Sequence, residues 1–131
     1  MWLASGMAGA TMGLMHVPVL VKAPNRRKAG YKALFLVDTG AIDSVVPASA
    51  AERAGIEPVG QKRYELADGS VREYAFGVAQ FEFMDEITAG RVIFGPENVE
   101  PILGVTALES AGILVDPINQ TLKRLPAISL K

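Results

Sequence analysis

The hydrophobic residues of the chain come mostly in short runs, and in several of these runs they alternate with polar residues. Runs of this length, bounded by Gly, Pro, Asn or Asp, are typical of β-strands joined by tight turns. Because strands outnumber helices, we expect an all-β fold with one or two short helices, closed as a barrel or packed as a sandwich. The pattern predicts strands at 17–22, 31–37, 45–46, 63–66, 71–74, 91–94, 113–115 and 122–125.

Two short helices are expected between the strands. The first begins near Pro47 and ends at Gly55, since proline favours the first turn of a helix and glycine its C-terminal end. The second follows a hydrophobic run that ends in glycine. There, Thr106 and Glu109 have the spacing of a capping box, and Gly112 supplies the C-terminal stop.

The middle of the chain predicts a hairpin followed by a long strand. Asp68-Gly69 separates two of the strands and is a strong hairpin signal, because both residues tolerate positive φ. After the hairpin, the apolar alternation that begins at Tyr74 changes phase at Phe81. A slip of one residue predicts a β-bulge, or a strand that crosses between two sheets, and Gly77 could absorb it.

The first 14 residues differ in composition from the rest of the chain. They carry no charge and are rich in Ala, Gly and Met. The segment is shorter than the roughly 20 apolar residues that a membrane span needs, and it lacks the basic start of a signal peptide. Met7, Met12 and Met15 are possible natural starts, so we expect residues 1–14 to be a non-native extension or an N-terminal arm at a subunit interface, and 15–131 to be one domain.

Charge narrows the class of function. The chain has 131 residues, of which 13 are basic and 14 acidic, and its net charge is −1 with the two signs well mixed. Such a chain has no electrostatic footprint for nucleic acid or anionic membrane, so we expect no nucleic-acid partner and no stable membrane span. The one basic cluster, Arg26-Arg27-Lys28, is interpreted as a solvated turn.

Cysteine and histidine usage limits the possible chemistry. The absence of cysteine excludes disulfides, thiol nucleophiles and thiolate metal sites, and it fits a cytoplasmic protein. His16 is the one histidine and opens an apolar strand, so a paired-histidine metal site within one chain is impossible. A structural role for His16 is favoured over a catalytic one. We expect no metal and no other cofactor.

The segment 34–46 carries the candidate chemistry. Four apolar residues suited to a buried strand run into Asp38, Thr39 and Gly40, and a second apolar run follows. An ionised carboxylate beside an apolar core is costly unless it is partnered, so a buried strand that presents Asp to a cleft is unusual. The Thr39 hydroxyl can hydrogen-bond backbone or a partner hydroxyl, and Gly40 allows another segment or a substrate to approach the backbone closely.

The run Phe-Leu-Val-Asp-Thr-Gly-Ala at 35–41, followed by Ser-Val-Val at 44–46, resembles the active-site loop of the pepsin-like and retroviral aspartic proteases. The Ile-Leu-Gly at 102–104, which leads into a short helix, resembles the segment that crosses behind that loop. The hairpin at 63–74 lies where such proteases carry the flap that closes over substrate. Order and spacing agree over about 17–125, and the resemblance implies a closed, retropepsin-like acid-protease barrel, one half of a pepsin-like enzyme.

This resemblance implies an aspartic endopeptidase. Hydrolysis by carboxylates alone needs two of them in one site, because one takes a proton from water while the other, still protonated, donates to the carbonyl oxygen. Asp-Thr-Gly occurs once in the chain, so the second carboxylate must come from a second chain across a two-fold axis. Asp38 of each subunit in a homodimer would form the dyad, Thr39 would lock the two loops together, and Gly40 would offer its carbonyl to a peptide or protein substrate.

The resemblance also implies where substrate binds. The hairpin would exclude water and pair with an extended substrate as an added strand. For Asp43, a substrate contact and a solvated loop position are equal alternatives, and Asp68 could serve only to form the turn. The expected substrate contacts are Ala41, Asp43, Ala67, Asp68, Gly69 and Ser70.

Departures from the family pattern leave a second hypothesis open. Retroviral enzymes commonly pair an acidic residue with an arginine at the positions of Ile42 and Val105 to brace the dimer, and both positions are apolar here. An apolar contact could replace that ion pair. The alternative to an enzyme is a catalytically silent retropepsin-like dimer that serves as a binding or scaffold module.

Overall fold

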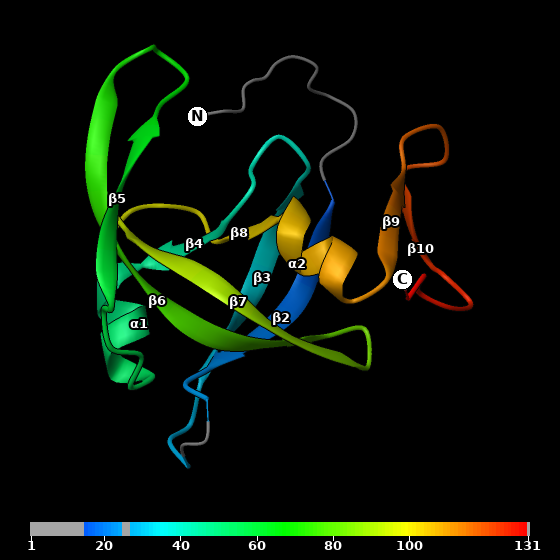
Figure 1. The fold of residues 1–131 in the computed structure, drawn as a ribbon, viewed down its shortest axis with the longest axis horizontal. Coiled ribbons are helices and arrows are strands. Elements are labelled where there is room, and N and C mark those ends of the chain that lie inside the picture. The colour runs from blue at the N-terminus through cyan, green and yellow to red at the C-terminus, as the bar shows by residue number, and fades with distance from the viewer. Residues whose placement is uncertain (1–14, 25–26, 131) are drawn as a thin grey trace.

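The computed structural model describes residues 15–24 and 27–130 (Figure 1). The segment 1–14 lies outside the described residues, so the two hypotheses about it stay open, and Arg26 of the basic cluster lies outside them too. The described elements are β2 (His16–Lys22), β3 (Tyr31–Asp38), β4 (Ser44–Pro47), α1 (Ala48–Arg53), β5 (Gly60–Glu65), β6 (Val71–Phe83), β7 (Glu86–Gly95), β8 (Ile102–Gly104), α2 (Val105–Ser110), β9 (Ile113–Asp116) and β10 (Thr121–Arg124).

Most of the strands form one sheet that closes on itself. Its order is β2-β3-β8-β4-β7-β6-β5, and β2 pairs a second time, with β6. Through this second pairing, six strands of the described chain form a closed barrel, and β5 extends from it as one arm of a hairpin. The strands β9 and β10 form a separate two-stranded sheet (Figure 1). The prediction of an all-β closed barrel with short helices is confirmed.

The barrel encloses the main hydrophobic core. On β2, Val17, Val19 and Val21 are buried while the residues between them are more exposed, because successive side chains of a strand point to opposite faces. They belong to the same cluster as Phe35 on β3 and Phe81 on β6, which are fully buried. This packing fixes the C-terminal end of β3, where the candidate chemistry begins.

The predicted bulge in the long strand is wrong. β6 keeps one continuous register with β7, and it lies in a single sheet. The apparent change of phase arises because the two halves of β6 bury opposite faces: Tyr74 packs against a small cluster under the hairpin, whereas Phe81 and Phe83 enter the barrel core. What changes along β6 is its second neighbour, which is β5 at the start and β2 near the end.

Both predicted helices are present, but the second begins earlier than the predicted capping box at Thr106. Gly55 and Gly112 follow the helices α1 and α2 with φ values of +82° and +75°, as expected of C-terminal stops. The capping box is wrong. Gly104 occupies the N-cap of α2, no side chain caps that helix, and Thr106 lies within it. The close packing of Gly104 against Ile42 and Asp43, in the loop that follows β3, sets this start.

Candidate active site

Asp38 is the last residue of β3, at the point where that strand leaves the core. The three residues before it are buried, and Asp38 itself is partly buried. Its Oδ1 accepts a hydrogen bond of 2.9 Å from the Gly40 N–H, and its carbonyl accepts one of 3.1 Å from the Ala41 N–H. These bonds hold the carboxylate in a defined orientation relative to its own loop.

A second segment crosses behind this loop and supports it. β8 runs parallel to β3, with Gly104 beside Asp38. The Gly104 N–H donates to the buried Ser44 hydroxyl over 3.0 Å, and the Val105 N–H donates to the Ala41 carbonyl over 2.8 Å. A side chain has no room at position 104, because a Cβ there would lie 2.7 Å from backbone atoms of the loop.

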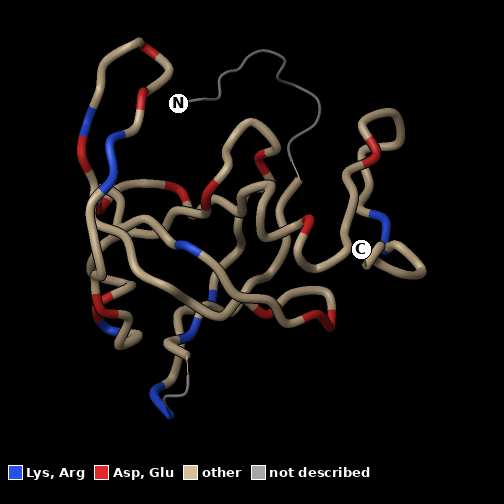
Figure 2. Tube along the Cα trace, in the orientation of Figure 1, with Lys and Arg blue, Asp and Glu red and all other residues tan. Residues whose placement is uncertain are grey.

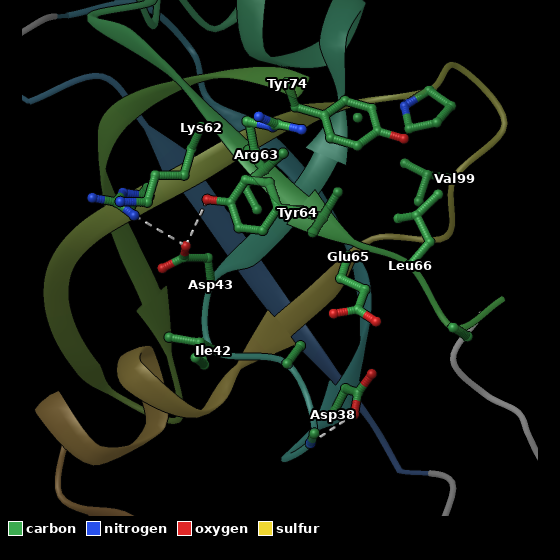
Figure 3. Close-up of a pocket in the computed structure, with 18 of the residues that line it drawn as sticks. Asp38, Ile42, Asp43, Lys62, Arg63, Tyr64, Glu65, Leu66, Tyr74 and Val99 are labelled. Carbon is green, nitrogen blue, oxygen red and sulfur yellow. Dashed lines mark hydrogen bonds and ion pairs between the residues drawn. The ribbon is translucent and has the colours of Figure 1, made fainter. Parts of the chain in front are cut away.

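A cleft of about 810 Å³ lies between this loop and the β5–β6 hairpin (Figure 3). Thr39, Gly69 and Ser70 are exposed and are not among the residues that line it. The structure shows where these residues lie and does not test what they do. Their roles in catalysis and substrate binding therefore stay predictions. The predicted site residues that line the cleft are Asp38, Gly40, Ala41, Asp43, Ala67 and Asp68.

Asp68 closes the tip of the hairpin. The Ser70 N–H and hydroxyl both donate to its Oδ1, over 2.8 and 2.6 Å. Gly69 has a φ of +86°, as the Asp-Gly signal predicts. The hydrogen bond from the Ser70 hydroxyl, and then that from its N–H, lower the pKa of Asp68. Asp68 therefore does form the turn, and its contact with substrate stays a prediction.

Comparison with known protein families identifies the family of this chain. The family described as "gag-polyprotein putative aspartyl protease" matches residues 26–110, which is more than half of the chain. The chain belongs to this retropepsin-like family. None of the curated proteins matches it.

Three solved structures are similar to this retropepsin-like chain. The retroviral protease-like domain of Ddi1 from Leishmania major is 18% identical with a TM-score of 0.52, over 87% of this chain and 90% of that one. The EIAV protease, complexed with an inhibitor, is 18% identical with a TM-score of 0.49, over 79% and 92%. A retropepsin-like aspartic protease from Rickettsia conorii is 20% identical with a TM-score of 0.45, over 79% and 84%. At 18% identity, the likeness to the Leishmania domain concerns the fold alone.

Three polar side chains from distant parts of the chain meet in the retropepsin-like cleft. The Tyr64 hydroxyl donates to Oδ2 of Asp43 over 2.8 Å, and Nη1 of Arg91 lies 3.4 Å from the same oxygen (Figure 3). The Asp43 side chain is only 11% exposed, so its interpretation as a solvated loop residue is wrong. Arg91 also lies over the Phe76 ring, with its guanidinium carbon 4.5 Å from the centroid.

Burial, and then the hydrogen bond to Asp43, raise the pKa of the Tyr64 hydroxyl above its usual value of 10.0. Tyr64 therefore remains protonated, and able to donate to Asp43, at acidic and neutral pH. It lies on β5 close to the turn of the hairpin, where it pairs with Arg72, so this bond ties the hairpin to the loop that follows β3. Asp43 is 21 residues from Tyr64 and 48 from Arg91, and no local sequence pattern could reveal contacts over such distances.

Much of the remaining cleft wall is apolar. Val45, Ile93 and Ile102 form a small buried cluster, and Tyr74 and Val99 pack against it. An apolar wall with a few polar groups suits the side chains of a peptide. Among the described residues, no group of three or more His, Cys, Asp or Glu could hold a metal ion.

His16 lies outside the cleft. Its Nε2 is 2.7 Å from Oε2 of Glu100, and both side chains are exposed. A surface pair between the start of β2 and the loop before β8 agrees with the structural role expected for this histidine. No helix in the described part of the chain is long and apolar enough to cross a membrane.

Proposed function

We propose that this chain is an aspartic endopeptidase that works as a homodimer, and that Asp38 of the two copies activates the attacking water. The observation that carries the proposal is the position of Asp38. It ends a buried strand, is oriented by its own loop and opens into a cleft beneath a hairpin. Membership of the retropepsin-like family supports the same conclusion.

Two such carboxyl groups facing each other across a two-fold axis could carry out the reaction. Carboxyls about 3 Å apart cannot both ionise, so the pair holds one proton in common. The ionised group removes a proton from water, whose oxygen attacks the peptide carbonyl carbon, while the protonated group donates to the carbonyl oxygen. The proton taken from water then passes to the leaving amine as the C–N bond breaks. A hydroxyl of the tetrahedral intermediate returns its proton to the carboxylate that had donated one, so the carboxylic acid is released and the dyad again holds one proton.

The other predicted site residues would position the dyad and the substrate. Thr39 is exposed beside Asp38, and in the proposed dimer its hydroxyl would hydrogen-bond the equivalent loop of the second copy. An extended peptide would lie along the hairpin as an added strand, with Gly40, Ala41 and Asp43 on one side and the tip at 67–70 on the other. Closure of the hairpin would exclude water from the reaction.

Cleavage of a peptide library by the purified protein, from acid to neutral pH, tests this function. We expect cleavage in the wild type, and loss of at least about a thousandfold in kcat with Asp38→Asn, because a dimer of the variant lacks both carboxylates of the dyad. A statine-type inhibitor directed at the dyad should block the wild type. Asp85→Asn, in the exposed turn between β6 and β7, is the matched control and should cleave normally.

Sedimentation of each variant shows whether the dimer is intact. Full activity of Asp38→Asn would refute the mechanism. If the wild type is a stable dimer that binds peptides and cleaves none of them, the chain is instead a silent binding or scaffold module.

A further inference from the structure

One wall of the cleft carries charged side chains that have no partner. Lys62, Arg63 and Glu65 lie on β5 and line the cleft, and within the described residues none of the three takes part in an ion pair or side-chain hydrogen bond. Asp43, by contrast, is already bound by Tyr64 and Arg91. The three side chains on β5 are therefore free to meet charges that a substrate brings.

These charges are separated along the strand by sign. Figure 2 shows the basic residues of β5 nearer the barrel and the acidic residue nearer the tip. In Figure 3, Glu65 lies on the Asp38 side of the cleft and Lys62 on the Asp43 side. The two are three residues apart, which is about 10 Å at the usual rise of a strand. Lys62 and Glu65 extend from opposite faces of β5, because successive side chains of a strand alternate. An extended peptide paired with β5 has the same rise and the same alternation, so two of its residues that are three apart would meet these two charges.

Lys62 and Glu65 are exposed in the open cleft, and closure of the hairpin over a peptide would make their charges effective in selecting substrate. When a peptide fills the cleft and the hairpin closes, water leaves, and charge interactions become stronger than at the open surface. A basic substrate side chain beneath Glu65 is then favoured, and an acidic one is repelled. At Lys62 the preference has the opposite sign.

We propose that Glu65 and Lys62 determine substrate specificity: Glu65 selects a Lys or Arg side chain close to the scissile bond, and Lys62 selects an acidic side chain about three residues farther out. The inference rests on the proposed endopeptidase function. In a homodimer the two-fold axis repeats both positions, so the preferred substrate has basic residues on both sides of the bond and acidic residues outside them.

A charge exchange between enzyme and substrate tests this proposal. One peptide carries Lys near the scissile bond and Glu three residues out on each side, and a second peptide has the two exchanged. We expect the wild type to prefer the first peptide by about tenfold in kcat/KM. Each subunit would contribute two favourable charge pairs, one at Glu65 and one at Lys62, and pairs of this kind can supply such a preference. The double variant Lys62→Glu/Glu65→Lys should prefer the second peptide, although its net charge is unchanged.

The control uses the other strand of the same hairpin. Arg72→Glu/Glu73→Arg exchanges two exposed charges on β6 that do not line the cleft, so the peptide preference should stay that of the wild type. The preference should also weaken as ionic strength rises. Equal cleavage of both peptides by the wild type, or an unchanged preference in the Lys62→Glu/Glu65→Lys variant, would overturn the proposal.

Binding separates this proposal from the endopeptidase function itself. Fluorescence anisotropy of the same two labelled peptides is measured with Asp38→Asn, with and without the Lys62→Glu/Glu65→Lys exchange. If the wild type cleaves nothing but binding follows the charge pattern, the catalytic function fails and the specificity stands. If cleavage occurs without a charge preference, the specificity fails and the function stands. Absence of both binding and cleavage overturns this proposal too.

Discussion

The Asp38 carboxylate is oriented by contacts within its own chain. Its Oδ1 accepts the Gly40 N–H, and a Cβ at position 40 would lie 3.2 Å from that same oxygen. The carboxylate and the glycine are therefore packed against each other with almost no spare distance. In the proposed dyad, a carboxylate displaced by a few tenths of an ångström would no longer face the second carboxylate and the attacking water in the best geometry.

We predict that Gly40→Ala lowers kcat/KM for a cleaved peptide by about tenfold or more, because the added methyl displaces the Asp38 carboxylate. Thermal unfolding should change little, since the loop is exposed at this position. Gly90→Ala is the control, because a Cβ there has no atom within 4 Å. Normal activity of Gly40→Ala would show that the carboxylate tolerates displacement.

Gly104 limits the same loop from behind, and here the neighbours are backbone atoms. A Cβ would lie 2.7 Å from atoms of Ile42 and Asp43, which cannot rotate away. We predict that Gly104→Ala destabilises the fold by about 3 kcal/mol, as overpacking of a tight site does, and that urea unfolding measures the loss. An unchanged midpoint relative to Gly90→Ala would contradict this account of the crossing.

At the scale of elements, the hairpin is held to the loop by the hydroxyl of Tyr64. We predict that Tyr64→Phe lowers the free energy of unfolding by about 1 kcal/mol and speeds hydrogen exchange along β5, because Asp43 loses one of its donors. Exchange along β2, inside the barrel, should be unaffected and serves as the internal control. Unchanged exchange along β5 would mean that the bond does not restrain the hairpin.

The same pair gives a pH dependence with a definite sign. The pKa of Tyr64 is raised in the folded chain, chiefly by burial, so folding favours the protonated phenol. The stability that this provides is fully present below pH 10 and is lost as the pH rises through the folded pKa. The difference in unfolding free energy between wild type and Tyr64→Phe should therefore be constant from pH 5 to 9 and fall above about pH 10.

Elements whose pattern is local could be predicted from the sequence, and those set by distant packing could not. The alternation of Val17, Val19 and Val21 predicts β2 because one face of a strand is buried. The alternation of apolar residues along β6 led to a wrong prediction of a bulge, because the two halves of the strand bury opposite faces. Which face is buried depends on the segments that pack against each half. The capping box predicted at Thr106 is wrong because α2 already begins after Gly104, which packs against the loop that follows β3.

At the scale of the whole molecule, the local features of the site could likewise be predicted from the sequence, and the contacts between distant residues could not. Asp38 and its loop form a contiguous motif that the sequence displays, and the structure places this motif at a cleft. The partners of Asp43 could not be predicted, because Tyr64 and Arg91 reach it only after the barrel and hairpin have formed. Barrel closure also depends on a second pairing of β2, with β6, that leaves no mark in the sequence of β2 itself.

A dyad shared between two chains makes a prediction that no single-chain enzyme can satisfy. If wild type and Asp38→Asn subunits exchange freely at constant total concentration, an equal mixture contains about one quarter wild-type dimers, and mixed dimers have one carboxylate in place of two. Activity should therefore fall to about one quarter, with a quadratic dependence on the wild-type fraction, whereas independent monomers would give one half. Mixing with Asp85→Asn should cost no activity. A linear dependence on the wild-type fraction after complete exchange would show that each chain works alone, so that Asp38 must find its second proton carrier within its own subunit.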